Sequence, residues 1–150
     1  TTGWKVGWLC GPAPLVQAAR TAKQFLTYVA GGPFQPAIAL GLGLPDSFFH
    51  GIATDLQAKR DRLLPGLVQA GFTVYPTSGT YFVTVDIRPL QPDGDGMAFC
   101  RALPGHCRVV AIPNEVLYAN KAAGRHLVRF AFCKRLDVLD EAVARLRTLG

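Results

Sequence analysis

The segment LVRFAFC, residues 127–133, places an arginine within a run of apolar side chains. The alternation of side chains in a strand puts Arg129 on the same face as Leu127 and Ala131, so a charged group emerges from an apolar stripe. A planar guanidinium binds a carboxylate through two parallel hydrogen bonds, and this pattern therefore indicates a carboxylate site. An arginine on the solvent face of a half-buried strand gives the same pattern, and the residues alone favour neither interpretation.

The cysteines and histidines show no spacing that is typical of catalysis or of metal binding. They are Cys10, Cys100, Cys107, Cys133, His50, His106 and His126. A structural zinc site needs closely spaced ligand pairs, and the sequence contains no CxxC. No histidine has the serine or cysteine partner pattern of a catalytic triad. We therefore expect free thiols in a reducing compartment, ordinary histidines and no metal.

The composition is that of a globular protein, with 49% hydrophobic and 17% charged residues. The net charge of +6 is compatible with a polyanion partner, but the basic residues are scattered and form no basic arm. Nucleic-acid binding is therefore not expected. No run approaches the roughly 20 apolar residues of a membrane helix, and no signal segment is recognised. The simplest expectation is a cytoplasmic protein.

The first half of the chain predicts one strand followed by helices. Residues 3–11 alternate bulky apolar side chains as a short strand does. Helices are expected over residues 12–28, 34–42 and 45–70, the first and last of them opened by prolines. Pro65 lies inside the long third helix and should kink it or split it.

The second half changes to strand character after Gly71, a plausible C-cap. Strands are expected at residues 72–75, 81–87, 109–112 and 127–132, and helices at residues 97–103 and 135–149. This order is typical of a small α/β sandwich. A lone strand needs a sheet to join, so residues 1–44 are expected to be the tail end of a larger domain. Residues 45–71 would then connect it to a small α/β domain, residues 72–150.

Three short segments in series carry a recognisable pattern. They are residues 2–8 (TGWKVGW), residues 79–82 (GTYF) with the strand that ends in Asp86, and residues 127–134 (LVRFAFCK) before the terminal helix. In this order and at this spacing, the chain resembles the C-terminal portion of pyridoxal-phosphate-dependent aminotransferases of fold type I. It is similar to the kynurenine and N-succinyldiaminopimelate aminotransferase group. The resemblance implies an α/β fold: the small C-terminal domain plus the last strand and helices of the large domain.

The resemblance also implies roles for individual residues. Arg129 matches the arginine that binds the substrate carboxylate, and Lys5 matches a contact to the cofactor phosphate; the alternative for Lys5 is a solvent-facing lysine on an edge strand. Tyr28 falls where relatives send an aromatic residue into the partner subunit's active site, although a core aromatic at a helix end is an equal alternative. Gly79 and Tyr81 border the substrate in relatives. Their alternative is turn chemistry, in which the glycine supplies a positive φ and the tyrosine favours the strand.

The activity implied by the resemblance is transamination between an amino acid and a 2-oxo acid, with pyridoxal phosphate as cofactor, in a homodimer. N-succinyldiaminopimelate and kynurenine-like molecules are the expected donors. The lysine that holds the cofactor as a Schiff base is expected upstream of Thr1, so this chain would carry no catalytic residue and be inactive alone. A carbon–sulfur lyase of the same fold and a truncated, non-catalytic remnant remain as alternatives.

Overall fold

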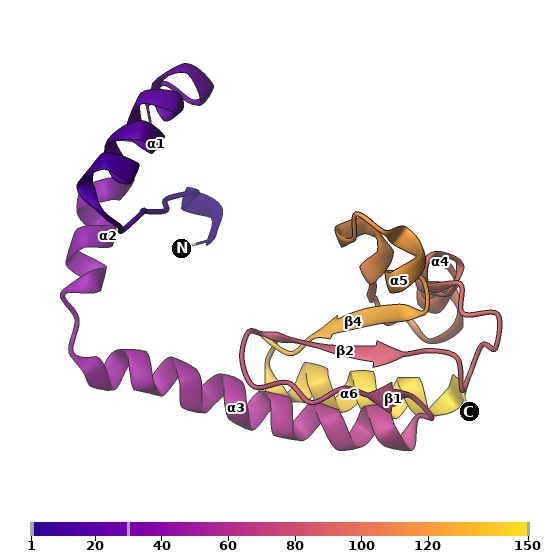
Figure 1. Cartoon of the computed structure of the whole chain (residues 1–150). Helices are drawn as coiled ribbons and strands as arrows, with labels where there is room; N and C mark the ends of the chain where they lie inside the picture. The colour runs from indigo at the N-terminus through magenta and orange to yellow at the C-terminus, as the bar shows by residue number, and fades with distance from the viewer. Residues whose placement is uncertain (1, 30, 150) are drawn as a thin grey trace. The chain divides into compact units, whose positions relative to one another are not determined.

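The computed structural model describes residues 2–29 and 31–149, and the chain divides into two compact units, residues 1–49 and residues 50–150 (Figure 1). Within the described ranges, no helix is both long enough and apolar enough to cross a membrane.

The first unit consists of short helical elements. These are the 3-10 helix η1 (Thr2–Trp4), the α-helices α1 (Ala13–Leu26) and α2 (Phe34–Leu42), and the start of α3 (Asp46–Gln69). Pro12 precedes α1 and Pro14 lies in its first turn, where a missing N–H costs nothing. Trp4 stacks on Phe34 with ring centroids 5.1 Å apart. Even so, no described side chain of residues 2–49 is buried.

The strand predicted over residues 3–11 does not form. Residues 2–4 make a single 3-10 turn, and residues 5–10 follow as irregular chain. The reason is that a strand is stabilised by the backbone hydrogen bonds of a neighbouring strand, and the alternating apolar pattern supplies side chains but no such neighbour.

Helix α3 runs without interruption through Pro65, so the predicted split does not occur. Its C-terminal part packs against α6 (Leu136–Leu146), and the two helices lie along the same side of the sheet (Figure 1). The contact depends on Gly66, because a Cβ there would lie 2.4 Å from the nearest methyl carbon of Val143. Gly71 follows the helix with φ of 95°, the left-handed conformation expected of a C-cap glycine.

The second unit contains a four-stranded antiparallel sheet in the order β1-β2-β4-β3. Its strands are β1 (Thr73–Val74), β2 (Phe82–Asp86), β3 (Ile112–Pro113) and β4 (Leu127–Ala131). The two central strands pair along their whole length, with Val83 opposite Phe130 and Val85 opposite Val128. These four side chains are buried, because they point to the face of the sheet that the helices cover.

The core of the second unit joins that face of the sheet to three helices. Leu63 and Leu67 come from α3, Leu139 and Leu146 from α6, and Leu103 from α4 (Gly96–Cys107), and all five are buried. The α/β class predicted from the sequence is therefore confirmed, with the helices packed on one face of an antiparallel sheet.

The remaining differences from the predicted elements lie near prolines and short turns. Helix α4 continues past Pro104 to Cys107, and β3 begins at Ile112 rather than at residue 109. The elements η2 (Asn114–Leu117) and α5 (Lys121–Gly124) were not predicted, and the end of the predicted terminal helix forms the separate 3-10 turn η3 (Arg147–Leu149). Such three- and four-residue helices contain too few residues for a recognisable hydrophobic period.

Candidate functional site

Arg129 lies in the middle of β4, on the face of the sheet that points away from the core. Its neighbours Val128 and Phe130 are buried in the core, whereas Leu127 and Ala131 share its outward face. In the register of the sheet, Arg129 stands opposite Thr84 of β2 and opposite Ile112 of β3. The guanidinium is therefore presented by the best-paired part of the sheet, with a strand on either side.

The Arg129 guanidinium is placed over the ring of Phe82, with its Cζ atom 4.6 Å from the ring centroid. This distance is within the range of a cation–π contact. Within residues 2–29 and 31–149, Arg129 forms no ion pair, whereas Arg62, Arg88 and Arg145 each hold a carboxylate. Arg129 can therefore accept a carboxylate from outside the described chain without first losing one from inside it.

Asp86 lies on the same outward face, at the end of β2, but it is already neutralised. Burial by itself would raise the pKa of its carboxyl, yet the hydrogen bonds from the Arg88 side chain and backbone N–H outweigh burial and hold this pKa below its ordinary value. His126 adds a second basic group, with its Nε2 3.9 Å from the carboxylate. Because Asp86 is held by these partners, it does not compete for Arg129.

A buried amide extends the polar part of this face. Asn114 is only 5% exposed, and its Nδ2 donates to the Thr84 Oγ1 at 3.4 Å. Its Oδ1 receives no hydrogen bond from the described side chains and backbone. Asn114 was not predicted from the sequence. The one local signal is its position directly after β3, two residues beyond Ile112, and Ile112 pairs with Arg129.

The turn before β2 carries Gly79 and Tyr81, and its strained residue is Thr80. Thr80 has φ of 65°, which is unusual for a β-branched residue, whereas Gly79 is not in the left-handed region. The alternative that Gly79 is required for a positive φ is therefore wrong. A Cβ on Gly79 would meet no heavy atom within 4 Å, so the turn is open at this point. Tyr81 is half exposed and packs edge-on against Phe82.

Lys5 and Tyr28 belong to the first unit, and both have left-handed backbones, with φ of 53° and 58°. Lys5 follows η1 on irregular chain, so the alternative of an edge-strand lysine is wrong. Its side chain is exposed and forms no ion pair in the described chain, and a Cβ on Gly3 or on Gly7 would meet nothing within 4 Å. An exposed ammonium in such open surroundings fits a phosphate group.

Tyr28 follows the end of α1 and is 79% exposed, so within this chain it is not the core aromatic of the alternative interpretation. It lines a hollow of about 530 Å³ in the first unit, together with Trp8, Lys23 and Ile38. The structure thus groups Arg129 with the turn at Gly79 and Tyr81 in one unit, and it places Lys5 and Tyr28 in the other.

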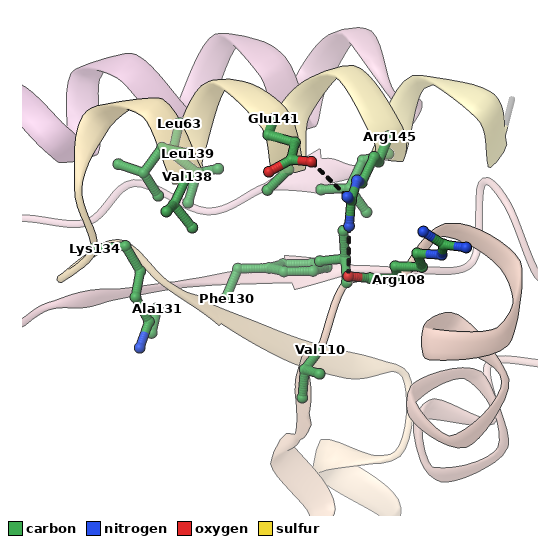
Figure 2. Close-up of a pocket in the computed structure, with 13 residues that line it drawn as sticks. Leu63, Arg108, Val110, Phe130, Ala131, Lys134, Val138, Leu139, Glu141 and Arg145 are labelled. Atoms are coloured by element: carbon green, nitrogen blue, oxygen red, sulfur yellow. Dashed lines mark hydrogen bonds and ion pairs between the residues drawn. The ribbon is translucent and has the colours of Figure 1, made fainter.

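A more enclosed cavity, of about 210 Å³, lies on the opposite face of the sheet and is separate from the candidate site (Figure 2). Phe130 of β4 and Leu139 of α6 form part of its wall, on the side of the sheet that the helices cover. At one end, Arg145 bonds to Glu141 and to the backbone carbonyl of Arg108. Arg129 points away from this side, so the cavity is no part of the carboxylate site. Among the described residues, no cluster of three or more potential metal ligands occurs.

The candidate residues are thus an arginine on the outward face of the sheet in the second unit, without an ion-pair partner among residues 2–29 and 31–149, and an exposed lysine between glycines in the first unit. The chain belongs to the aminotransferase class I and II family, which matches residues 1–146. The fold is fold type I of the pyridoxal-phosphate-dependent aminotransferases, matched over the length of this chain. The family resemblance noted in the sequence is thereby confirmed.

Particular relatives can be named. The chain is 50% identical to a probable N-succinyldiaminopimelate aminotransferase of Mycobacterium tuberculosis, over 99% of this chain and 39% of that protein. It is 34% identical to the kynurenine–oxoglutarate transaminase of Dictyostelium discoideum, over 94% of this chain and 37% of that protein. The solved structure of the M. tuberculosis N-succinyldiaminopimelate aminotransferase superposes with a TM-score of 0.90, over 99% of this chain and 38% of that one. The chain thus spans less than half the length of these relatives.

Proposed function

We propose that this chain forms the part of a pyridoxal-phosphate-dependent transaminase that binds the substrate carboxylate. The observation that carries the proposal is Arg129, an arginine on the outward face of a rigid sheet with no ion-pair partner in the described residues. Amino acids and 2-oxo acids share a carboxylate next to the reacting carbon, and a bidentate bond from Arg129 fixes the orientation of that carbon. One arginine thereby serves both substrates of a transamination.

Lys5 is proposed to bind the cofactor phosphate, because its ammonium is exposed and the glycines on either side leave room for a large group. Pyridoxal phosphate, when bound, supplies the electron-withdrawing ring and the carbonyl that the amino group needs. Gly79 and Tyr81 are proposed to border the substrate, since their turn is open and directly precedes Phe82. Tyr28 is proposed to reach the partner subunit's site in a cytoplasmic homodimer, and its exposure supports this role.

The proposed substrates are an N-succinyldiaminopimelate or kynurenine-like amino donor and a 2-oxo acid acceptor. The names of the relatives support this choice, with the greater identity to the N-succinyldiaminopimelate enzyme. The decisive experiment joins this chain to the rest of the M. tuberculosis enzyme, in place of the segment that it matches. We expect this chimaera to transaminate N-succinyldiaminopimelate with 2-oxoglutarate. Release of pyruvate from cystathionine without an oxo acid would instead identify a carbon–sulfur lyase.

Arginine variants of the chimaera test the role of Arg129. The substitution Arg129→Leu should lower kcat/KM by roughly 100-fold, because two charge-assisted hydrogen bonds are lost. Arg129→Lys should recover only part of the lost kcat/KM, since a lysine keeps the positive charge but lacks the two parallel N–H donors of the guanidinium. Arg101→Leu on α4 is the matched control, because Arg101 is exposed and is no part of the site. An unchanged kcat/KM in Arg129→Leu would contradict the proposal.

The isolated chain is proposed to be inactive. All five of its lysines lie in the described ranges and none is buried, whereas a lysine that forms a Schiff base needs a setting that lowers its pKa. The chain would be mixed with pyridoxal phosphate, reduced with borohydride and mapped by mass spectrometry. We expect weak labelling spread over several lysines, and stoichiometric labelling of one lysine would show the opposite.

A further inference from the structure

An arginine that binds a carboxylate works best when its side chain is ordered before the substrate arrives. A free arginine side chain samples many rotamers, and binding must then restrict them at an entropic cost. Arg129 has no carboxylate partner within the described residues, so an ion pair does not order it. The contact that the structure provides instead is the Phe82 ring, 4.6 Å from the guanidinium carbon. This contact does not neutralise the guanidinium charge.

Phe82 is in turn held by its neighbours. Its backbone N–H donates to the Thr80 Oγ1, and the Thr80 hydroxyl faces the Phe82 carbonyl oxygen, both at 3.3 Å. Its ring meets the Tyr81 ring edge-on, with centroids 5.7 Å apart. Thr80 makes these contacts from a left-handed backbone that β-branched residues rarely adopt. Strained residues persist where the surrounding structure holds them, often beside functional sites.

The sheet aligns these groups. Phe82 stands opposite Ala131, two residues along β4 from Arg129, so the ring and the arginine are diagonal neighbours on one face. Thr84, the residue directly opposite Arg129, is bonded by Asn114. On β2, the Thr80 turn therefore holds the backbone of Phe82, and the buried amide of Asn114 holds the side chain of Thr84.

We propose that Phe82 is a positioning residue that orders the Arg129 guanidinium before substrate binds, and that Thr80 fixes Phe82 for this purpose. The inference rests on the proposed role of Arg129 as the carboxylate-binding residue. It assigns to the ring the function that a carboxylate has at other arginines of this chain. A protein carboxylate in that place would compete with the substrate, whereas a ring does not.

The geometry is tested on the chain itself by nuclear magnetic resonance. Side-chain protons of Arg129 should be shifted upfield by the Phe82 ring, and the Nε–H group should show a large heteronuclear Overhauser effect, the sign of an ordered group. Phe82→Leu should abolish the upfield shift and lower that effect, while Phe82→Tyr should preserve both. Wild-type resonances of Arg129 at random-coil positions would overturn the proposal.

Variants at Thr80 test the second part. Thr80→Ser retains the hydroxyl and should leave the Arg129 signals unchanged, whereas Thr80→Gly allows the same backbone without the hydroxyl and should reduce their order. Circular dichroism of each variant confirms that the fold is retained. If Thr80→Gly leaves Arg129 as ordered as in the wild type, Thr80 has no positioning role.

Kinetics of the chimaera separate this inference from the proposed function. Phe82→Leu should raise KM for the amino donor by about 3- to 5-fold, the value of an exposed cation–π contact, with Phe82→Tyr restoring it. An unchanged KM in Phe82→Leu, beside a large loss in Arg129→Leu, would overturn the positioning role alone. An unchanged kcat/KM in Arg129→Leu would refute the carboxylate site. The resonance measurements would still decide whether Phe82 orders the arginine.

Discussion

In residues 50–150, apolar side chains from three helices and a sheet are packed into one core, whereas no described side chain of residues 2–49 is buried. The first unit nevertheless has regular helices, begun by prolines and ended by turns. Helices as short as α2, with nine residues, are marginal in water by themselves. The comparison shows that local sequence signals define helices in both units, while only the second has a core of buried side chains among the described residues. Large apolar side chains such as Phe25 and Leu26 are left on the surface of the first unit, which supports the proposal that residues 1–44 belong to a larger domain.

Truncation of a leucine in each unit should show the greatest difference. Leu67→Ala removes a fully buried side chain from the core and should lower the free energy of unfolding by about 2–5 kcal/mol. Leu26→Ala removes one that is 80% exposed and should change it by less than about 0.5 kcal/mol. Urea unfolding followed by far-ultraviolet circular dichroism measures both. Equal losses would mean that the first unit has a core of its own.

Two glycines of α3 offer a finer comparison within one helix. Gly66→Ala forces a methyl group against Val143 and should destabilise the chain by about 1–3 kcal/mol. Gly51→Ala meets open space and should stabilise the helix by about 0.5–1 kcal/mol, because alanine loses less conformational entropy. Thermal unfolding of the two variants checks the opposite signs. A stabilising Gly66→Ala would show that α3 and α6 are not closely packed there.

Low pH should decrease the free energy of unfolding of the second unit through protonation of Asp86. Its folded-state pKa is lowered, so the stabilisation by its ion pair is fully present above the ordinary value of 3.8 and is lost as the pH falls below it. Asp86→Asn should cost about 1–3 kcal/mol at pH 7. The difference from the wild type should shrink below pH 3.8, as shown by urea unfolding at several pH values. The exposed Asp93→Asn serves as control, and a difference that grows in acid would contradict the assigned ion pair.

The smallest expected effect is a difference in reactivity between exposed and buried cysteines, which thiol labelling measures. Cys10 and Cys133 are exposed, while Cys100 and Cys107 lie in the core, where burial raises the pKa of the Cys100 thiol to about 11. A thiol reagent at pH 8 should therefore modify two cysteines quickly and the other two only after unfolding. Fast reaction of all four cysteines would show that the core opens readily.

Local patterns were sufficient for much of the fold. Helix α2 has the predicted bounds, and β2 and β4 lie within the predicted strands, since proline, glycine and alternation act over a few residues. Alternation also placed Arg129 on one face with Leu127 and Ala131, and the structure shows that this face points away from the core. The pattern alone favoured neither a substrate arginine nor an ordinary surface arginine; the family motifs favour the substrate role, which stays a prediction.

Other features depend on partners that are distant in the sequence. Asn114 forms a hydrogen bond with Thr84, 30 residues away in the sequence, and no local pattern predicts such a contact. The left-handed conformation was expected at Gly79 but occurs at Thr80, because the hydroxyl of Thr80 bonds the next-but-one residue. The strand predicted for residues 3–11 failed for a related reason: its sequence had the right side chains but the described chain offers it no neighbouring strand.

The outer strands of the sheet have a consequence for self-association. Both β1 and β3 contain only two residues, and β3 includes Pro113, which has no N–H to donate. A strand from a second molecule could form few backbone hydrogen bonds with either edge of the sheet. The sheet is therefore a poor template for cross-β growth, so if copies of this chain adhere to one another, the contacts should be made by exposed helical side chains and should not propagate into fibrils.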